Sequence, residues 1–412
     1  MICKKNYRSL KIYCKKNKKL VVKNVFKVFG EEPKKALKML QNGKSKEEIF
    51  KKTGMTIGVQ DASFEIYEGE IFVIMGLSGS GKSTLVRLLN RLIEPTSGKI
   101  YIDETDVTNL NDKNLIEIRR KKISMVFQSF ALMPHMNILD NVSFGLELSG
   151  VDKKSRYEAA LDALKQVGLE NYGLSYPDEL SGGMQQRVGL ARALANNPDI
   201  MLMDEAFSAL DPLIRTEMQD ELLQLQNSAQ RTIVFISHDL DEAIRIGDRI
   251  AIMQNGEISQ IGTPEEIINN PANDYIKSFF KGVDVTSVLT ASHIAKKVRS
   301  TIINKEGTGI KTALQYISDF DDDYAYFIEK SGKYIGILTL ESLKEQKRVG
   351  GTIHDAIIDE SPINENLQIS EFISDIAEHK YPTAVINEEG KYKGTISKSR
   401  LLKVFDEGVD YE

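Results

Sequence analysis

The stretch Gly76-Leu-Ser-Gly-Ser-Gly-Lys-Ser-Thr84 is the feature that most limits what this chain can fold into. It follows the apolar run Ile71–Met75, which has the length of a buried strand, and precedes the helix-forming run Leu85–Leu92. A glycine-rich loop between a strand and a helix turns its backbone N–H groups inward and presents the positive end of the helix dipole. The sequence therefore predicts a phosphate-binding loop in an α/β domain.

The residue types in this loop suit a nucleoside triphosphate with its metal. Lys82 is expected to reach the β and γ phosphates, and the hydroxyl of Ser83 to bind Mg²⁺. The expected cofactors are thus ATP and Mg²⁺. The other loop residues expected to contact the nucleotide are Gly76, Ser78, Gly79, Ser80, Gly81 and Thr84.

A second apolar run, Ile200–Met203, ends in the carboxylates Asp204 and Glu205. A buried strand with this ending would release Asp204 toward the metal and Glu205 toward the attacking water, as a polarising base. Acidic residues are common at strand ends. Their order after the phosphate-binding loop makes this pair a predicted part of the same site.

Three zones follow one another along the 412 residues, which suffice for two or three domains. Residues 1–54 are rich in lysine and prone to form helices, with Pro33 opening one run. From Gly58 to about Phe280, strand-like and helix-like runs alternate, as in an α/β domain with a largely parallel sheet. The predicted buried strands are Ile71–Met75, Ile123–Phe127, Ile200–Met203, Thr232–Ile236 and Ile250–Met253.

The third zone, from about Val283, contains an internal repeat. Gly332-Lys-Tyr-Ile-Gly336 recurs as Gly390-Lys-Tyr-Lys-Gly394, and each copy has apolar runs on both sides. This spacing predicts two copies of a βαββα unit in an α+β module. The alternative is that two unrelated hairpins share a Gly-Lys-Tyr turn.

Composition narrows the classes of protein. The longest apolar runs are far shorter than the roughly 20 residues of a membrane-spanning helix, so any membrane contact is expected to pass through a partner. The chain has a net charge of −5 and lacks a basic patch with interspersed aromatic residues. Both features argue against a protein that binds nucleic acid. Cys3 and Cys14 have no companions at metal-ligand spacing, which fits a cytoplasmic location.

The two ends of the chain carry opposite charge. The basic N-terminal extension, residues 1–20, is either solvated or meets anionic lipid. The acidic tail, residues 406–412, is either solvated or competes with anionic lipid for a basic surface.

Between these regions, Leu180-Ser-Gly-Gly-Met-Gln185 precedes an apparent helix and resembles the signature motif of ABC ATPases. This resemblance implies that Ser181, Gly182 and Gly183 bind the γ phosphate of an ATP held by a second subunit. The implied assembly is a head-to-tail pair of nucleotide-binding domains with two ATP molecules between them.

Further elements match this family in order along the chain. Gln128 resembles the Q-loop glutamine, which contacts the metal and senses the membrane partner, and Ser208-Ala-Leu-Asp211 resembles the D-loop. His238 resembles the switch histidine, which contacts the γ phosphate. Phe29 resembles the aromatic residue that stacks on adenine; the alternative is a core aromatic. By this resemblance the catalytic residues are Glu205, His238, Lys82 and Gln128, and the metal-binding residues are Ser83, Gln128 and Asp204. Asp211 of the D-loop is expected to contact the nucleotide.

Within the family, the sequence is most similar to the ATPases of the glycine betaine/proline, or quaternary amine uptake, importers. The similarity lies in the segments 130–136, 176–180 and 204–210 and in an insertion before the phosphate-binding loop. It implies ATP-driven osmolyte import through a separate membrane permease, associated with a substrate-binding domain, and a peripheral place at the cytoplasmic face of the membrane. The alternatives are another small solute (methionine, a metal or a sugar) and an ABC ATPase that serves no transporter.

The same resemblance implies a domain plan with a paired CBS module. The expected parts are an ATPase domain at 21–280, with an insertion at 31–54 and a helical subdomain at 129–180, and CBS units at 283–345 and 350–405. Such modules are associated with control by ionic strength or cyclic di-AMP. Their ribose-binding Thr-x-x-Asp pattern is incomplete in this sequence. The residue three positions after Thr339 is Ser342, and the residue three positions after Ser397 is Arg400. Simple AMP binding is therefore not expected, and a dimer contact without a ligand is the alternative.

Overall fold

The computed structural model describes residues 17–128, 130–280, 286, 289–297, 300–305, 308–320 and 322–407. The chain divides into two compact units between Lys281 and Gly282, and each is described by itself. We call them the ATPase unit, after the activity expected from its sequence motifs, and the C-terminal unit. The basic N-terminal extension up to residue 16 and the tail from residue 408 lie outside the described residues.

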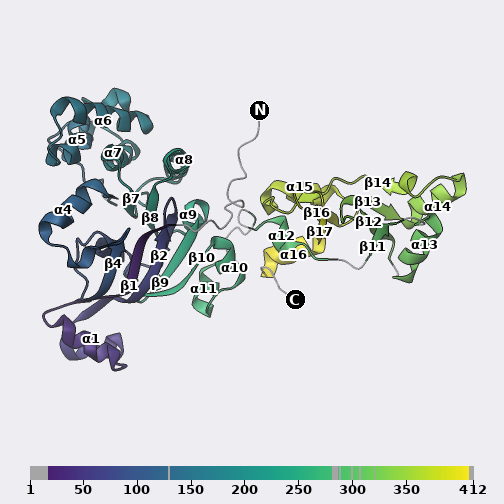
Figure 1. Cartoon of the computed structure of the whole chain (residues 1–412), viewed down its shortest axis with the longest axis horizontal. Helices are drawn as coiled ribbons and strands as arrows, with labels where there is room; N and C mark the ends of the chain where they lie inside the picture. Colours follow the sequence, from purple (N-terminus) through teal and green to yellow (C-terminus); the bar gives the residue numbers. More distant parts are fainter. Residues whose placement is uncertain are drawn as a thin grey trace. The chain divides into compact units, whose positions relative to one another are not determined.

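A six-stranded sheet forms the centre of the ATPase unit (Figure 1). Its strand order is β10-β9-β3-β8-β7-β6, and all neighbours are parallel except β10 and β9. The strands are β3 (Ile71–Met75), β6 (Ile123–Val126), β7 (Ile200–Asp204), β8 (Thr232–Ser237), β9 (Arg249–Gln254) and β10 (Glu257–Gly262). All five strands predicted from the sequence are therefore confirmed. Strands β3, β7 and β8 are buried throughout, which explains their unbroken apolar runs.

A second sheet packs against the first and has the order β2-β1-β4-β5. It contains β1 (Lys18–Phe29), β2 (Thr56–Tyr67), β4 (Ser97–Ile102) and β5 (Thr105–Asp106), all antiparallel. Phe64 of this sheet stacks on Phe72 of the central sheet, with ring centroids 5.3 Å apart. Both side chains belong to the core that underlies the phosphate-binding loop.

The insertion before the phosphate-binding loop forms two short helices, α1 (Pro33–Gln41) and α2 (Lys46–Thr53). Ser45 and Glu48 make a reciprocal capping box at the start of α2, and Gly54 ends it in the left-handed conformation. Strand β1 ends at Phe29, which pairs with Thr56 at the start of β2. The insertion is thus the loop of a β-hairpin, in which Val28 and Phe29 pair with Ile57 and Thr56 although the register shifts further along the strands.

The remaining helices of the ATPase unit flank the two sheets. Three of them, α5, α6 and α7, pack on one another and form the helical group in Figure 1. The helices are α3 (Lys82–Leu89), α4 (Asp112–Lys121), α5 (Ile138–Leu148), α6 (Lys153–Gln166), α7 (Gly182–Ala195), α8 (Pro212–Ala229), α9 (Leu240–Ile246), α10 (Pro264–Asn269) and α11 (Asp274–Phe279). The helical group extends past residue 180, because it includes α7. This helix begins with the signature glycines.

The C-terminal unit contains the same order of elements twice, strand–helix–strand–strand–helix. A short helix, α12 (Ala291–Ile294), precedes both copies. The first copy is β11 (Thr301–Asn304), α13 (Ile310–Asp319), β12 (Tyr324–Glu329), β13 (Tyr334–Thr339) and α14 (Leu340–Val349), followed by β14 (Ile357–Ile358). The second is β15 (Ile363–Asn364), α15 (Ile369–Glu378), β16 (Thr383–Ile386), β17 (Tyr392–Ile396) and α16 (Lys398–Glu407).

The two repeats meet through their Gly-Lys-Tyr turns. The backbone N–H of Tyr334 donates to Gly390 O at 3.0 Å, and that of Tyr392 donates to Gly332 O at 2.9 Å. The rings of Tyr326 and Tyr392 stack nearby, with centroids 5.4 Å apart. This exchange is reciprocal, so the two copies contact each other through equivalent residues.

No helix in the described parts of either unit combines the length and the apolar character needed to cross a membrane.

Candidate active site

The phosphate-binding loop lies between β3 and α3, where Gly76 and Gly81 cannot be replaced without a clash. Gly76 has φ +152°, and a Cβ there would come within 2.2 Å of Met253 O. Gly81 has φ +100°, and a Cβ there would come within 2.4 Å of Gly58 O. These close approaches let the backbone curl around a small anion.

Lys82 is the first residue of α3, and only 5% of it is exposed. Its Nζ donates to the carbonyls of Gly76 at 2.8 Å and Leu77 at 3.2 Å, and lies 3.8 Å from Glu205 Oε1. Burial lowers the pKa of this amine, while the carboxylate of Glu205 opposes the shift. The ammonium group is therefore held across the mouth of the loop.

Ser83 and Asp204 form the pair expected to bind the metal. The hydroxyl of Ser83 donates to Asp204 Oδ1 at 2.8 Å, which joins the start of α3 to the end of β7. Arg87 lies 3.5 Å from the other carboxylate oxygen. Arg87 is four residues after Ser83, so it shares a helix face with it, a spacing that sequence reasoning had not used.

Glu205 is the residue on which the predicted catalytic groups converge. Its Oε2 accepts a 3.3 Å hydrogen bond from Gln128 Nε2 and lies 3.4 Å from His238 Nδ1. Its backbone is in the left-handed region, with φ +48°, which is uncommon for a residue other than glycine. With Lys82 on Oε1, three separate segments thus contact one carboxylate.

Ser208 also belongs to this cluster, although only Asp211 of the D-loop was predicted as a site residue. Its hydroxyl lies 3.4 Å from Gln128 Nε2 and donates to Glu205 O at 2.9 Å. The sequence signal for it is its place three residues after Glu205, in a tight turn. Asp211 itself caps α8 by accepting from the N–H of Ile214 at 3.1 Å.

A buried carboxyl group supports the switch histidine. Glu242 in α9 accepts hydrogen bonds from Ser237 Oγ and, at 3.1 Å, from Gln219 Nε2. Burial raises the pKa of Glu242 above its ordinary value, although both hydrogen bonds oppose the shift. Ser237 immediately precedes His238, so this network fixes the end of β8 from which the histidine projects.

The signature residues are separate from this cluster. Ser181 caps α7 by accepting from the N–H of Met184 at 3.4 Å, and both Ser181 and Gly182 are exposed. Among the described residues, no hydrogen bond or ion pair links Ser181, Gly182 or Gly183 to Glu205 or Lys82. An exposed helix N-terminus of this kind is able to receive an anion from another molecule.

Phe29 lies beside the phosphate-binding helix. A Cβ added to Gly58 would come within 2.8 Å of the Phe29 ring and 3.5 Å of Thr84 Cγ2, so the ring and Thr84 border the same small space. The Nζ of Lys27 lies 5.1 Å from the ring centroid. Phe29 is 40% exposed, as an aromatic platform for a base would be.

The cluster fits ATP with Mg²⁺ on its own features. Ser80 Oγ is buried beside Gly76 without a hydrogen-bond partner among the described residues, and a phosphate oxygen is a suitable acceptor for it. Ser83, Asp204 and Gln128 offer hydroxyl, carboxylate and amide oxygens, the ligands that Mg²⁺ prefers. The predicted loop and metal residues thus lie together.

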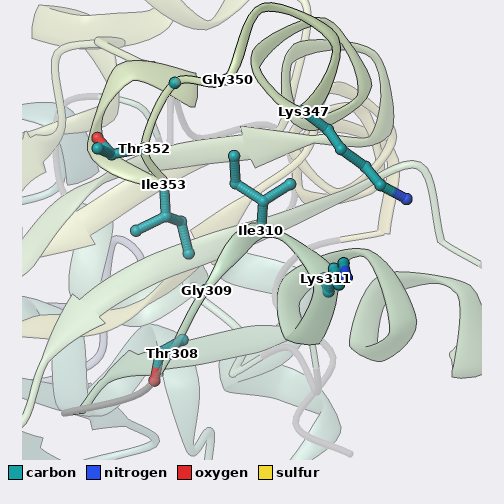
Figure 2. Close-up of a pocket in the computed structure, with 9 residues that line it drawn as sticks. Thr308, Gly309, Ile310, Lys311, Lys347, Gly350, Thr352 and Ile353 are labelled. Carbon is teal, nitrogen blue, oxygen red and sulfur yellow. The ribbon is translucent and has the colours of Figure 1, made fainter.

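A separate hollow of about 500 Å³ lies in the C-terminal unit, between the start of α13 and the loop after α14. Figure 2 shows Ile310 and Ile353 facing its centre and the Lys347 side chain extending away from it. Both its lysines, Lys311 and Lys347, are exposed. This hollow is therefore open and lacks a buried charged group.

Comparisons with known proteins agree with this geometry. A family model described as "ABC transporter" matches residues 59–208, from β2 to the D-loop. The chain is 59% identical to the glycine betaine/proline betaine transport system ATP-binding protein ProV of Escherichia coli, over 95% of this chain and 99% of that protein. The chain is an ATP-binding subunit of the ABC transporter family.

Two further comparisons support this assignment. The glycine betaine transport ATP-binding protein OpuAA of Bacillus subtilis is 53% identical to this subunit, over 93% of this chain and 91% of its own length. The dimeric structure of MJ0796, a bacterial ABC transporter cassette, matches with a TM-score of 0.51 and 35% identity, over 59% of this chain and 98% of that one. This ATP-binding subunit is therefore an ATPase with the ABC fold, and it hydrolyses ATP for transport.

Proposed function

We propose that this subunit powers the import of an osmoprotectant such as glycine betaine through a separate membrane permease. The convergence of Lys82, Gln128 and His238 on Glu205 is the observation that carries the ATPase part of this proposal. The choice of solute rests on the relatives, since ProV and OpuAA are both named as proteins of glycine betaine transport.

The reaction assigned to this site is the attack of water on the γ phosphate. Glu205 accepts the proton of that water, Lys82 binds the phosphate oxygens, and His238 contacts the γ phosphate from the end of β8. Ser83, Asp204 and Gln128 would hold Mg²⁺, which would supply positive charge against the negative charge that develops on the phosphate. Phosphoryl transfer depends mainly on position and charge, and these side chains supply both.

A second copy of the subunit completes the site in this proposal. Ser181 and Gly182 are exposed at the start of α7, Gly183 is half-buried, and among the described residues none of the three has a hydrogen bond or ion pair to Lys82 or Glu205 of its own chain. They are suited to bind the γ phosphate held by the other copy, in a head-to-tail dimer with Asp211 at the contact. Exposed Leu77 and Leu213, which adjoin these loops, agree with a contact there.

The helical subdomain is the surface proposed to meet the permease, at the cytoplasmic face of the membrane. Leu174 is 82% exposed, and Tyr172 and Tyr176 are also exposed in the segment between α6 and α7. The chain that follows Gln128 runs through Met133 and Met136 to α5, where the backbone N–H groups of Ile138 and Leu139 donate to Ser175 O and Gly173 O of this segment. A helix of the permease that binds here would contact the Q-loop directly.

The C-terminal unit is proposed to be a tandem CBS module that regulates transport. Its repeated element order and the reciprocal contact of its turns support this assignment. Thr339 and Ser342 bond each other's backbone N–H at 3.1 and 3.0 Å, so both hydroxyls already serve as a helix cap. Arg400 donates to Ile294 O at 2.5 Å. These bonds argue against AMP bound in the usual way.

We propose that this module responds to cyclic di-AMP or to ionic strength. Lys333 and Lys391 pair through their backbones where the two turns meet, so two lysines lie at this contact, and Lys391 Nζ also lies 2.7 Å from Glu389 Oε2. Such a pair offers counter-charge to a ligand with two phosphates, or responds to screening by salt. A dimer contact without a ligand is the competing role.

The full-length subunit, reconstituted with its permease in vesicles that contain anionic lipid, tests this proposal. We expect glycine betaine to stimulate ATP hydrolysis, and cyclic di-AMP or salt to alter the stimulation. Deletion of residues 283–412 should remove the response to cyclic di-AMP or salt. Hydrolysis indifferent to glycine betaine but stimulated by methionine, a metal or a sugar would overturn the choice of solute.

A further inference from the structure

The segment after Gln128 lies along the helix that begins with the signature motif. A Cβ on Gly182, in the first turn of α7, would lie 3.8 Å from the Phe130 ring. A Cβ on Gly189, two turns later, would lie 3.7 Å from Phe130 O. Glycines at these two places therefore let the segment run close to the helix.

One side chain of α7 holds this segment. Arg192 donates from one guanidinium nitrogen to Phe130 O at 3.0 Å and from another to Ala131 O at 2.6 Å. Ala131 has φ +50°, a left-handed conformation that is uncommon for a residue other than glycine. The two bonds from one planar group fix consecutive carbonyls in this conformation.

This contact differs from a hydrogen bond at the surface, because the guanidinium group of Arg192 is partly shielded from water. Burial lowers the pKa of its guanidinium, and among the described residues no carboxylate pairs with it. Removing a cation from water without a counter-ion is costly, and the two carbonyls are its compensation. The continuation of the segment is held as firmly, since the buried amide of Asn141 bonds both Met133 N, at 2.8 Å, and Met133 O, at 3.1 Å.

We propose that Arg192 is a positioning residue for Gln128, and that through it α7 holds the Q-loop in register with the signature serine. Gln128 lies two residues before the held carbonyls and contacts Glu205. Ser181 lies at the other end of the same helix. Arg192 thus couples the half-site that binds the chain's own ATP to the half-site offered to the second copy. This inference rests on the proposed role of Gln128 at the metal.

A double-mutant cycle on the full-length subunit tests this role, with Arg192→Met and Gln128→Ala made singly and together. The readouts are kcat for ATP hydrolysis and the Mg²⁺ concentration for half-maximal rate. We expect Arg192→Met to raise that concentration and lower kcat by about 10-fold, as for other groups that orient a metal ligand. In the Gln128→Ala background, Arg192→Met should change both by less than about twofold.

Arg231→Met is the matched control. Its guanidinium is also partly buried, with a lowered pKa, but donates to Asn197 outside the site. We expect it to leave the Mg²⁺ dependence unchanged. Arg192→Lys keeps the charge but loses the paired hydrogen bonds, so we expect an intermediate shift in the Mg²⁺ concentration for half-maximal rate. If Arg192→Met fails to fold, Arg192→Lys replaces it in the cycle.

Three results would overturn the inference in distinguishable ways. Equal effects of Arg192→Met in both backgrounds would show that Arg192 does not act through Gln128, and would leave the proposed function untouched. An unchanged Mg²⁺ dependence in Gln128→Ala alone would refute the metal role of Gln128 and the inference with it. A fall in Tm with unaltered Mg²⁺ dependence would reduce Arg192 to a structural residue.

Discussion

The side-chain amide of Gln219 donates a 3.1 Å hydrogen bond to the carboxyl group of Glu242, between two helices that follow different loops of the active site. Gln219 lies in α8, the helix that Asp211 caps. Glu242 lies in α9 and also bonds Ser237, the neighbour of His238. Arg215 and Asp239 make a parallel contact at 3.1 Å. The D-loop helix and the switch loop are therefore fastened together at two points.

The raised pKa of Glu242 predicts a pH dependence of stability. The folded state keeps a proton that the unfolded state loses near the ordinary value of 4.5, so stability falls as pH rises from there through the raised pKa. Glu242→Gln copies the protonated carboxyl and can keep both hydrogen bonds. We expect its Tm to exceed that of the parent at neutral pH and the difference to shrink toward pH 5. Parallel Tm curves for the two proteins would refute this assignment.

Glu205→Gln should separate nucleotide binding from hydrolysis. The amide cannot accept the proton of the attacking water, so kcat should fall by about 100-fold or more. ATP binding should persist, and an ATP-bound dimer should accumulate, measurable by size-exclusion chromatography with ATP and Mg²⁺. An unimpaired variant would show that another group is the base.

Phe29→Ala should weaken ATP binding if the ring stacks on adenine. Stacking of an aromatic side chain on a base contributes about 1–3 kcal/mol, so the KM for ATP should rise at least about fivefold. Phe29→Tyr should keep the parent value. Phe50→Ala removes another phenylalanine, 56% exposed on α2, and should leave KM unchanged. If Phe29→Ala resembles Phe50→Ala, the ring is only part of the core.

Tyr326→Phe should loosen the contact between the two repeats. The fully buried Tyr326 donates its hydroxyl to Pro382 O at 2.6 Å, and the loss of this bond costs about 1 kcal/mol. Amides of β12 and β16 should then exchange hydrogen about fivefold faster in the full-length chain. Tyr172→Phe, an exposed tyrosine of the ATPase unit, serves as the control. Unchanged exchange in the first variant would contradict the expected contribution of this bond.

The parts of the site that could be predicted are those that depend on local sequence. Strands β3 and β8 are buried on both faces, so their unbroken apolar runs identify them without knowledge of their neighbours. Parallel strands bring their carboxyl ends to one edge, which is why the residues that follow β3, β7 and β8 meet at Glu205. Short motifs at those ends were therefore enough to assemble the catalytic cluster.

The contacts that sequence did not reveal join ordinary residues far apart in the chain. Arg192 meets Phe130 across more than sixty positions, and neither residue type points to the other. Likewise, the insertion at 31–54 separates Phe29 from Thr56 along the chain, yet the hairpin pairs these two residues. Such pairings depend on how helices and strands pack, which local pattern does not specify.

The reciprocal bonds between the Gly-Lys-Tyr turns have a consequence for how the two copies of the repeat can change over generations. Each turn is donor and acceptor to its counterpart, since Tyr334 bonds Gly390 while Tyr392 bonds Gly332. A substitution that shifts either turn disturbs both bonds. The two repeats are thus free to diverge in sequence along their helices, whereas at these turns each repeat limits the substitutions that the other can accept.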